Sequence, residues 1–333
     1  MRSLEDRFNK NYHYPWTFIN DVPFSEEFKL QTSAMASGKT EYGFIPPSDW
    51  DVPENINTTK YDECVKNMVE NDVIYGHSRS YRNMCRFNSG YFFRQEIVQK
   101  YKWYFRVEPD VEYFCDFQMD PFEVLRVNKK KYGFVISILE YVDTIPTLWD
   151  TIEGFMKKYP QYIHPNNSIE FVTNKDPIGF TAVPEYNNMY NLCHFWSNFE
   201  IGDLEFFNSE PYLKYFEHLD EAGGFYYERW GDAPVHSLGL SILMDKNEIY
   251  NFEDIGYYHV PFSTCPESDP IRINKRCICK ESTNYTNINL NPHSCLSRFW
   301  RHGGGKTFLK DIFKPEEYFD HEELENLQLL ENV

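Results

Sequence analysis

The stretch Trp103-Tyr-Phe-Arg-Val-Glu-Pro-Asp110 decides the fold class of this chain. Its first five residues are mostly aromatic or β-branched, which predicts a β-strand over 103–107, and Pro109 ends the strand because proline cannot donate a ladder hydrogen bond. Glu108 and Asp110 flank that proline, so both carboxylates project from the strand end with little backbone freedom. Ligands of α/β sheets usually bind at the carboxyl ends of strands, which makes this turn a candidate site.

Strand-like and helix-like segments alternate on both sides of this stretch. We expect a helix over 60–71 with Thr58 or Thr59 as its cap, and a strand over 132–139. This alternation predicts an α/β fold in which a mixed central sheet is flanked by helices. Further expected segments are a helix-like start over 1–8, a short strand at 18–19, an extended loop over 38–53, helices over 147–158 and 234–244, a helix capped by Ser209 and ended by Gly223-Gly224, and an irregular cysteine-rich region over 261–302. For the domain organisation we expect a single catalytic domain over 1–312, followed by an acidic tail with a helix over 313–333.

The charge balance excludes nucleic acid as a partner. The formal net charge is -18, and such a chain repels phosphate backbones. An anionic sugar nucleotide remains possible where a metal ion or a local arginine neutralises its phosphates. Aromatic residues make up 18% of the chain, which suits both a hydrophobic core and the stacking of sugar faces on rings.

Cysteines and glycosylation sequons indicate an oxidising, secretory compartment. There are eight cysteines, and sequons begin at Asn57, Asn166 and Asn284. Cys265, Cys277, Cys279 and Cys295 lie close in sequence, but their close pair is C-x-C rather than the C-x-x-C of zinc sites, so we favour disulfides over zinc. No apolar run approaches the roughly 20 residues of a membrane helix. We therefore expect the sequence to be part of a longer protein.

Several clusters of residues have the chemistry of a site. Glu108 and Asp110 offer oxygen ligands for a hard divalent cation, although a solvated turn explains them as well. In Asn191-Leu-Cys-His-Phe-Trp-Ser-Asn-Phe-Glu-Ile201, Glu200 is a candidate for facing a sugar carbon, with Trp196 supporting the sugar and Asn198 binding a hydroxyl. The alternative is a loop glutamate paired with a nearby base.

Two further segments hold candidate polar residues. Asp232 in Glu228-Arg-Trp-Gly-Asp-Ala-Pro-Val-His236 either caps the following helix or accepts a hydrogen bond from an acceptor hydroxyl. His259 either completes a metal site or bonds to the backbone. Three arginines at 79, 82 and 86, beside Tyr81, form a basic spot suited to a phosphate or to ion pairs.

Taken together, these stretches resemble the fungal Golgi α-1,2-mannosyltransferases, type II membrane enzymes that extend O- and N-linked mannose chains. The resemblance runs from the start to about residue 300. It rests on Ser80-Tyr-Arg-Asn-Met-Cys-Arg-Phe87, Arg106-Val-Glu-Pro-Asp110, Ile145-Pro-Thr-Leu-Trp149, residues 191–201, residues 228–236 and Tyr258-His259.

The resemblance implies a nucleotide-sugar transferase fold of the GT-A type, GDP-mannose as donor, Mn²⁺ as cofactor, a mannose-containing glycan as acceptor and retention at the anomeric carbon. It implies that Glu108 and His259 hold the metal and that Glu200 is the candidate nucleophile. Tyr81 would then lie near the diphosphate, and Arg106, Trp196 and Asp232 near the sugars.

The resemblance also implies a membrane anchor, a stem and an apolar strand before the first helix, all of which would precede residue 1. A chain without that strand suggests an alternative, a catalytically impaired carbohydrate-binding or scaffolding relative. A glycoside hydrolase is a second alternative, since paired carboxylates also cleave sugars. The carboxylates of Glu-Pro-Asp together with His259 indicate metal ligands, which disfavours this alternative.

Overall fold

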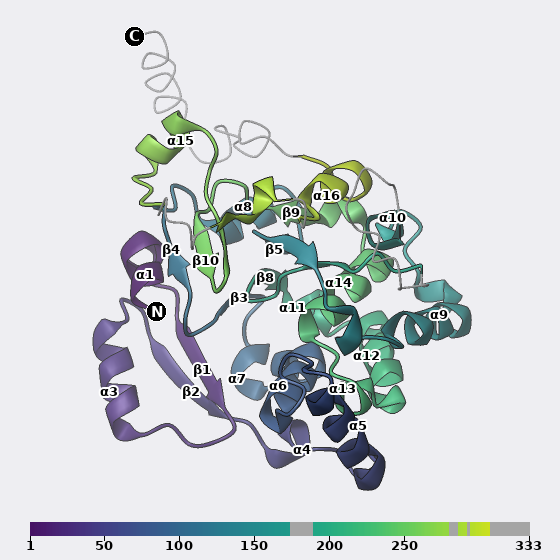
Figure 1. Ribbon diagram of the computed structural model, residues 1–333. Coiled ribbons are helices and arrows are strands. Elements are labelled where there is room, and N and C mark those ends of the chain that lie inside the picture. Colours follow the sequence, from purple (N-terminus) through teal and green to yellow (C-terminus); the bar gives the residue numbers. More distant parts are fainter. Residues whose placement is uncertain (174–188, 280–285, 292–293, 307–333) are drawn as a thin grey trace.

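The computed structural model describes residues 1–173, 189–279, 286–291 and 294–306 (Figure 1). A four-stranded sheet lies at its centre, with strand order β3-β8-β5-β9. Strand β8 runs antiparallel to both β3 and β5, and β9 runs parallel to β5, so the predicted mixed sheet is confirmed. The bounds are β3 (Trp103–Val107), β8 (Phe199–Asp203), β5 (Tyr132–Phe134) and β9 (Ile249–Asn251).

The two faces of this sheet pack into separate hydrophobic clusters, because successive side chains of a strand point to opposite faces. Tyr132 and Phe134 of β5 belong to the larger cluster, which includes residues of the long helices. Phe199 and Ile201 of β8 belong to the smaller one. Glu200 lies between these two residues in the chain and therefore points to the same face as Tyr132.

The long helices pack on the face that Tyr132 shares. Helices were correctly predicted over 60–71, 147–158 and 234–244, and one was correctly predicted after Ser209. Their caps differ from expectation: Asn57, not Thr58 or Thr59, accepts the capping hydrogen bond, and the Ser209 hydroxyl makes none. The bounds are α5 (Thr58–Glu70), α6 (Arg79–Gly90), α9 (Leu148–Lys158), α12 (Glu210–Ala222), which ends at Gly223 with φ 75°, and α14 (Asp232–Leu243).

The N-terminal part forms a small unit that has a two-stranded sheet of its own (Figure 1). Strands β1 (Trp16–Asn20) and β2 (Thr40–Phe44) pair in parallel, and α3 (Glu26–Met35) connects them. The expected loop over 38–53 was therefore wrong, since it holds β2 and α4 (Pro47–Trp50). The strand forms because its partner β1, distant in sequence, supplies the backbone hydrogen bonds. The helix-like start is confirmed as α1 (Arg2–Leu4), a π-helical turn over Glu5–Asn9 and α2 (Lys10–Tyr12).

A second four-stranded sheet carries His259. Its order is β12-β11-β10-β4, with β4 (Glu112–Tyr113), β10 (Tyr257–His259), β11 (Phe262–Thr264) and β12 (Thr286–Asn287). The region 261–302 is thus less irregular than expected, and it also contains α15 (Asp269–Asn274) and α16 (Leu296–His302). The single strand expected over 132–139 is broken after Phe134. Its second half is β6 (Ser137–Leu139), which pairs with β7 (Cys193–Phe195).

The remaining helical segments are short. They are α7 (Glu96–Gln99), α8 (Pro121–Val127), α10 (Ile169–Thr173), α11 (Leu204–Phe207), α13 (Gly224–Tyr227) and single 3-10 turns at Phe92–Arg94, Val142–Thr144, Pro160–Tyr162, Lys246–Glu248 and Ile288–Leu290. None of the helices among the described residues is both long and apolar enough to span a bilayer. The helix expected in the tail over 313–333 lies outside the described residues, and the extent of the catalytic domain stays a prediction.

Disulfides join distant parts of the chain, as the sequence indicated. The pairs are Cys115–Cys277, Cys193–Cys295 and Cys265–Cys279, with sequence separations of 162, 102 and 14. The two cysteines of the C-x-C pair, Cys277 and Cys279, form disulfides with Cys115 and Cys265, so neither is a thiolate that could bind zinc. Cys64 and Cys85 are not bonded to another cysteine. Cross-links that close long loops restrict the unfolded chain and so stabilise the C-terminal half.

Glu41 on β2 ties the N-terminal unit to the segment before β3. Its carboxylate contacts the ammonium groups of Lys39 and Lys100, each at 2.5 Å, and accepts a hydrogen bond from the Tyr101 hydroxyl at 2.8 Å. The bond from Lys100 is the largest influence, and together with Lys39 it lowers the pKa of Glu41 from 4.5 to about 2 against the opposing effect of burial.

We expect Glu41→Gln to lower the free energy of unfolding at pH 7 and to change it little near pH 2. The folded pKa lies below the unfolded one, so the stabilisation is present above about 4.5 and disappears as pH falls through about 2. Urea unfolding between pH 2 and 7 measures this. The control is Glu26→Gln, whose side chain is 90% exposed beside Lys29. The same pH dependence in both variants would contradict the assignment.

Candidate active site

The register of β3 and β8 brings Arg106 beside Glu200. These residues pair directly across the antiparallel ladder, and side chains of such pairs lie on the same face. The Arg106 Nη1 atom lies 3.8 Å from Glu200 Oε1. On the other side the Arg106 Nε donates to Glu108 Oε1 at 2.7 Å. Arg106 therefore joins the strand-end carboxylate to the buried one.

Asp232 is the third carboxylate on Arg106. It accepts hydrogen bonds from Arg106 Nη1 and from the Ser197 hydroxyl, the latter at 2.8 Å. Burial alone would raise the pKa of Asp232, but the positive charges of Arg106 and His236 outweigh it and lower that pKa. Of the two roles considered for Asp232, that of N-cap is wrong, because Gly231 occupies the cap and Asp232 is the first residue of α14. Its carboxylate is thus available to the cluster.

Three carboxylates around one guanidinium keep Arg106 charged. Burial disfavours the charge, but Asp232, Glu108 and Glu200 outweigh burial and raise the pKa of Arg106 further above its usual range. The three carboxylates outnumber the positive charges of Arg106 and His236, so the cluster has a net negative charge. Such a cluster attracts a metal ion or a positively charged reaction centre.

Glu200 is fully buried and its two oxygens differ. Oε2 accepts a hydrogen bond from the Tyr132 hydroxyl at 2.9 Å and lies 3.1 Å from His236 Nδ1. Oε1 has no hydrogen-bond partner within the described part of the chain. Gly202 makes room for the rings beside this carboxylate, since a Cβ atom there would lie 2.5 Å from the Tyr104 ring. Oε2 is therefore fixed by two neighbours, whereas Oε1 has only the guanidinium of Arg106 at 3.8 Å.

Trp196, Asn198 and His259 form a neighbouring wall. The Trp196 and His259 rings lie 4.9 Å apart, edge to face. Asn198 Oδ1 accepts from the Tyr257 hydroxyl at 2.9 Å, which ties the loop before β8 to β10. His259 Nδ1 lies 3.0 Å from the Val260 carbonyl oxygen. Since that oxygen only accepts, Nδ1 is the donor of this contact, and in a neutral ring Nε2 then has the free lone pair of a metal ligand.

Strand pairing brings the Glu-Pro-Asp turn near His259. Tyr258 of β10 pairs with Glu112 of β4, and the next antiparallel pair would place His259 opposite Val111, three residues after Glu108. The carboxylate of Glu108 is 27% exposed, and Asp110 is exposed. Both contacts of Arg106 use Oε1 of Glu108, which leaves Oε2 for a cation.

The carboxylates and His259 do not by themselves enclose an ion. Among the described residues, the one group with three potential ligand atoms within 4.8 Å of one another is Cys115, Cys277 and Cys279, all of which are in disulfides. Any metal here therefore needs oxygen atoms from a ligand to complete its coordination, as expected for an ion that is bound together with phosphates.

The basic spot on α6 is built into the protein interior. Arg86 is 3% exposed and forms an ion pair with Asp220 at 2.7 Å, and Arg82 donates to the Glu228 carbonyl oxygen at 3.1 Å. These contacts correspond to the ion-pair alternative, and the binding of phosphate by Arg86 stays a prediction. Tyr81 stacks on Tyr75 with ring centroids 4.5 Å apart.

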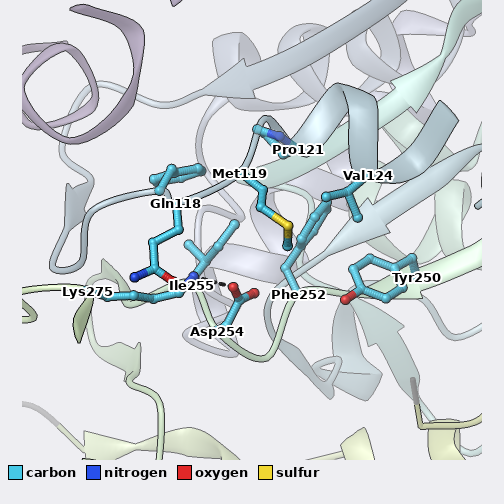
Figure 2. A pocket seen from close by; sticks show the side chains of 10 residues that line it. Gln118, Met119, Pro121, Val124, Tyr250, Phe252, Asp254, Ile255 and Lys275 are labelled. Carbon is cyan, nitrogen blue, oxygen red and sulfur yellow. Dashed lines mark hydrogen bonds and ion pairs between the residues drawn. The ribbon is translucent and has the colours of Figure 1, made fainter. Parts of the chain in front are cut away.

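A small pocket lies on the other face of the molecule's core, away from these residues. Figure 2 shows Met119, Phe252 and Tyr250 lining it, with Lys275 paired to Asp254 at its edge. Its volume is about 20 Å³, room for about one water molecule. It is too small for a nucleotide, and none of the predicted site residues line it.

Sequence reasoning did not single out His236, Tyr132 or Ser197, which all contact the acidic cluster. His236 is the last residue of the segment 228–236 and lies four residues, about one helical turn, after Asp232. That spacing places both on one face of α14 and was a usable signal. Tyr132 gave no signal, because aromatic residues in strands are common core residues.

Comparison with known proteins defines the class. The crystal structure of core-mannan synthase A from Aspergillus fumigatus in its Mn/GDP form matches with a TM-score of 0.83 and 40% identity, covering 92% of this chain and 80% of that one. The mannosyltransferase Ktr4p of S. cerevisiae in complex with GDP matches with a TM-score of 0.83 and 37% identity, covering 93% and 79%. The fold is that of a nucleotide-sugar glycosyltransferase, as expected.

Sequence comparison defines the family. The probable mannosyltransferase KTR2 of Saccharomyces cerevisiae is 57% identical over 313 residues, which are 93% of this chain and 73% of that protein. The alpha-1,2 mannosyltransferase KTR1 of the same yeast is 48% identical over 300 residues, 90% of this chain and 73% of that protein. The family described as glycolipid 2-alpha-mannosyltransferase matches residues 1–303, and the chain belongs to it.

Proposed function

We propose that this protein is a retaining α-1,2-mannosyltransferase that moves mannose from GDP-mannose to a hydroxyl of a mannose-containing glycan. The observation that carries the proposal is the buried carboxylate of Glu200, held by three contacts to Arg106, Tyr132 and His236, in a chain of this family. A buried acid with one reactive oxygen fits the stabilisation of a cationic sugar.

The donor set of the turn fits Mn²⁺. Carboxylate oxygens suit this ion and an imidazole nitrogen is compatible with it, and Glu108 and His259 supply one of each. Core-mannan synthase A was solved in a Mn/GDP form, which supports the same ion here. When bound, the ion supplies positive charge to the departing diphosphate. We assign a contact with the donor to Asp110, which is exposed in the same turn as Glu108.

Glu200 acts on the sugar by one of two routes. In the first, Oε1 bonds to the anomeric carbon as the bond to GDP breaks, and GDP leaves with the electron pair. The acceptor hydroxyl then displaces Glu200. In the second, the acceptor attacks from the face that GDP leaves, and Glu200 only stabilises the positive charge. Both routes retain the anomeric configuration.

The other residues bind the substrates. Asp232 is assigned to the acceptor: its carboxylate accepts a hydrogen bond from the hydroxyl that attacks the sugar. Arg106 orients Asp232 and Glu108 through the contacts described above. Trp196 supports a sugar face, Asn198 binds a hydroxyl, and Tyr81 lies near the diphosphate.

The place of action is proposed by likeness to the family. We infer that the full-length protein is anchored in the Golgi membrane with this part in the lumen, where glycoproteins are its acceptors. The three disulfides are consistent with an oxidising compartment.

Calorimetry of GDP binding tests the proposal directly. We expect GDP to bind in the presence of Mn²⁺ and much more weakly after chelation, because the ion neutralises the diphosphate beside an acidic cluster. Mannose release from GDP-mannose with an α-mannoside acceptor then tests transfer. Equal GDP binding with and without Mn²⁺, or transfer that persists in chelator, would reject the metal-dependent enzyme.

A further inference from the structure

His236 lies behind the reactive carboxylate, on the side away from Arg106's contact with Oε1. Its side chain is fully buried in α14. The Nδ1 atom is 3.1 Å from Glu200 Oε2, and Nε2 is 2.9 Å from the backbone carbonyl oxygen of Asn88. The ring therefore bridges β8 and α6 through both of its nitrogens.

Both partners of the ring are acceptors. A neutral imidazole has one N–H donor and one bare nitrogen, so it satisfies only one acceptor. The Asn88 carbonyl always accepts, which places a proton on Nε2. An ionised Glu200 also only accepts, which places a second proton on Nδ1. The geometry thus requires an imidazolium whenever Glu200 is ionised.

Aromatic rings enclose the His236 ring. Phe92, Phe207 and Tyr212 lie 6.3, 5.1 and 6.3 Å from it between ring centroids. They shield it from water, and burial of this kind disfavours the charge.

The charged groups that face the ring come from three elements. They are Glu200 from β8, Asp232 from its own helix α14, and Arg106 from β3. Burial lowers the pKa of His236, but Glu200 and then Asp232 outweigh burial and the opposing charge of Arg106, and the pKa is raised above 6.5. The buried hydroxyls of Tyr132 and Tyr104 also face Glu200 and remain neutral, since burial raises the pKa of each.

We propose that His236 is a positioning residue that stays doubly protonated behind Glu200, fixes Oε2 and so directs the free Oε1 at the sugar. The role in transfer rests on the function proposed above, whereas the protonation state does not. With Oε2 occupied by His236 and Tyr132, the carboxylate cannot rotate without losing two hydrogen bonds in a buried setting. The reacting oxygen is thereby chosen before the substrate binds.

Nitrogen-15 NMR of histidine-labelled protein tests the protonation state without any need for activity. We expect both ring nitrogens of His236 to be protonated at pH 7, with the signal assigned by its absence in His236→Gln. In Glu200→Gln the ring pKa should fall, because the carboxylate that holds the second proton is gone. One bare ring nitrogen at pH 7 in the unaltered protein, or a pKa unchanged by Glu200→Gln, would overturn the proposal.

Kinetics test the positioning role. We expect His236→Gln to lower kcat by about 10-fold or more, as removal of supporting hydrogen bonds commonly does, while the KM for GDP-mannose changes little. The matched control is His218→Gln, a part-buried histidine whose Nε2 lies 3.0 Å from the Thr151 carbonyl oxygen, outside the site. An unchanged kcat in His236→Gln would refute the role. If every variant and the unaltered protein lack transfer while the NMR result holds, the proposed function fails and the protonation state stands.

Discussion

Glu200→Gln is expected to reduce mannose transfer by about 10³-fold or more, since loss of a group that acts directly on the reacting atoms has effects of this size. Gln has nearly the shape of Glu and still accepts a hydrogen bond from Tyr132. It removes the negative charge that stabilises the sugar and the nucleophilic oxygen of the covalent route. The loss should therefore appear in kcat rather than in donor binding. Steady-state transfer from GDP-mannose to a mannoside measures kcat, and calorimetry measures GDP binding with Mn²⁺.

The control for this variant is Glu205→Gln, which removes a carboxylate close in sequence whose side chain is 84% exposed. It should retain transfer. Circular dichroism of both variants checks folding, because Glu200 is buried next to Arg106 and His236. Near-normal transfer by a folded Glu200→Gln protein would refute the direct role of Glu200 in the reaction.

Glu108→Gln and His259→Ala are each expected to weaken the apparent affinity for Mn²⁺, in the presence of GDP, by more than about 100-fold. Loss of a residue that merely supports a metal ligand costs about 10- to 100-fold in affinity, and loss of a ligand costs more. The effect should be largest for Glu108→Gln, which also leaves Arg106 without one of its carboxylates. Titration of Mn²⁺ at fixed GDP gives the apparent affinity.

Glu63→Gln on α5 is the control, since its side chain is exposed on a helix away from the turn. It should bind Mn²⁺ and GDP as the unaltered protein does. Unchanged Mn²⁺ affinity in both Glu108→Gln and His259→Ala would place the ion elsewhere and remove the basis for these two ligands.

The sequence predicted the elements whose signals are local. Strand β3 followed from its own residues and from Pro109, and the helix after Ser209 followed from the spacing of Tyr212, Tyr215 and Phe216. These patterns decide the structure because each residue's backbone preference and burial act within a few positions. Strand β2 was missed for the converse reason. Thr40–Phe44 has a glycine and two polar residues, and it becomes a strand only through pairing with β1.

The sequence by itself determined that this chain is an α/β protein, cross-linked by disulfides, in which Glu108 and Asp110 directly follow a strand. Only the tertiary structure decided which charges meet. The contact of Arg106 with Asp232 spans 126 positions, and that of Arg86 with Asp220 spans 134. Both pairs use the same residue types, yet one lies in the candidate site and the other supports two packed helices. The physical reason is that charge attracts over distance without regard to sequence order, so the register of strands and the packing of helices select the partner.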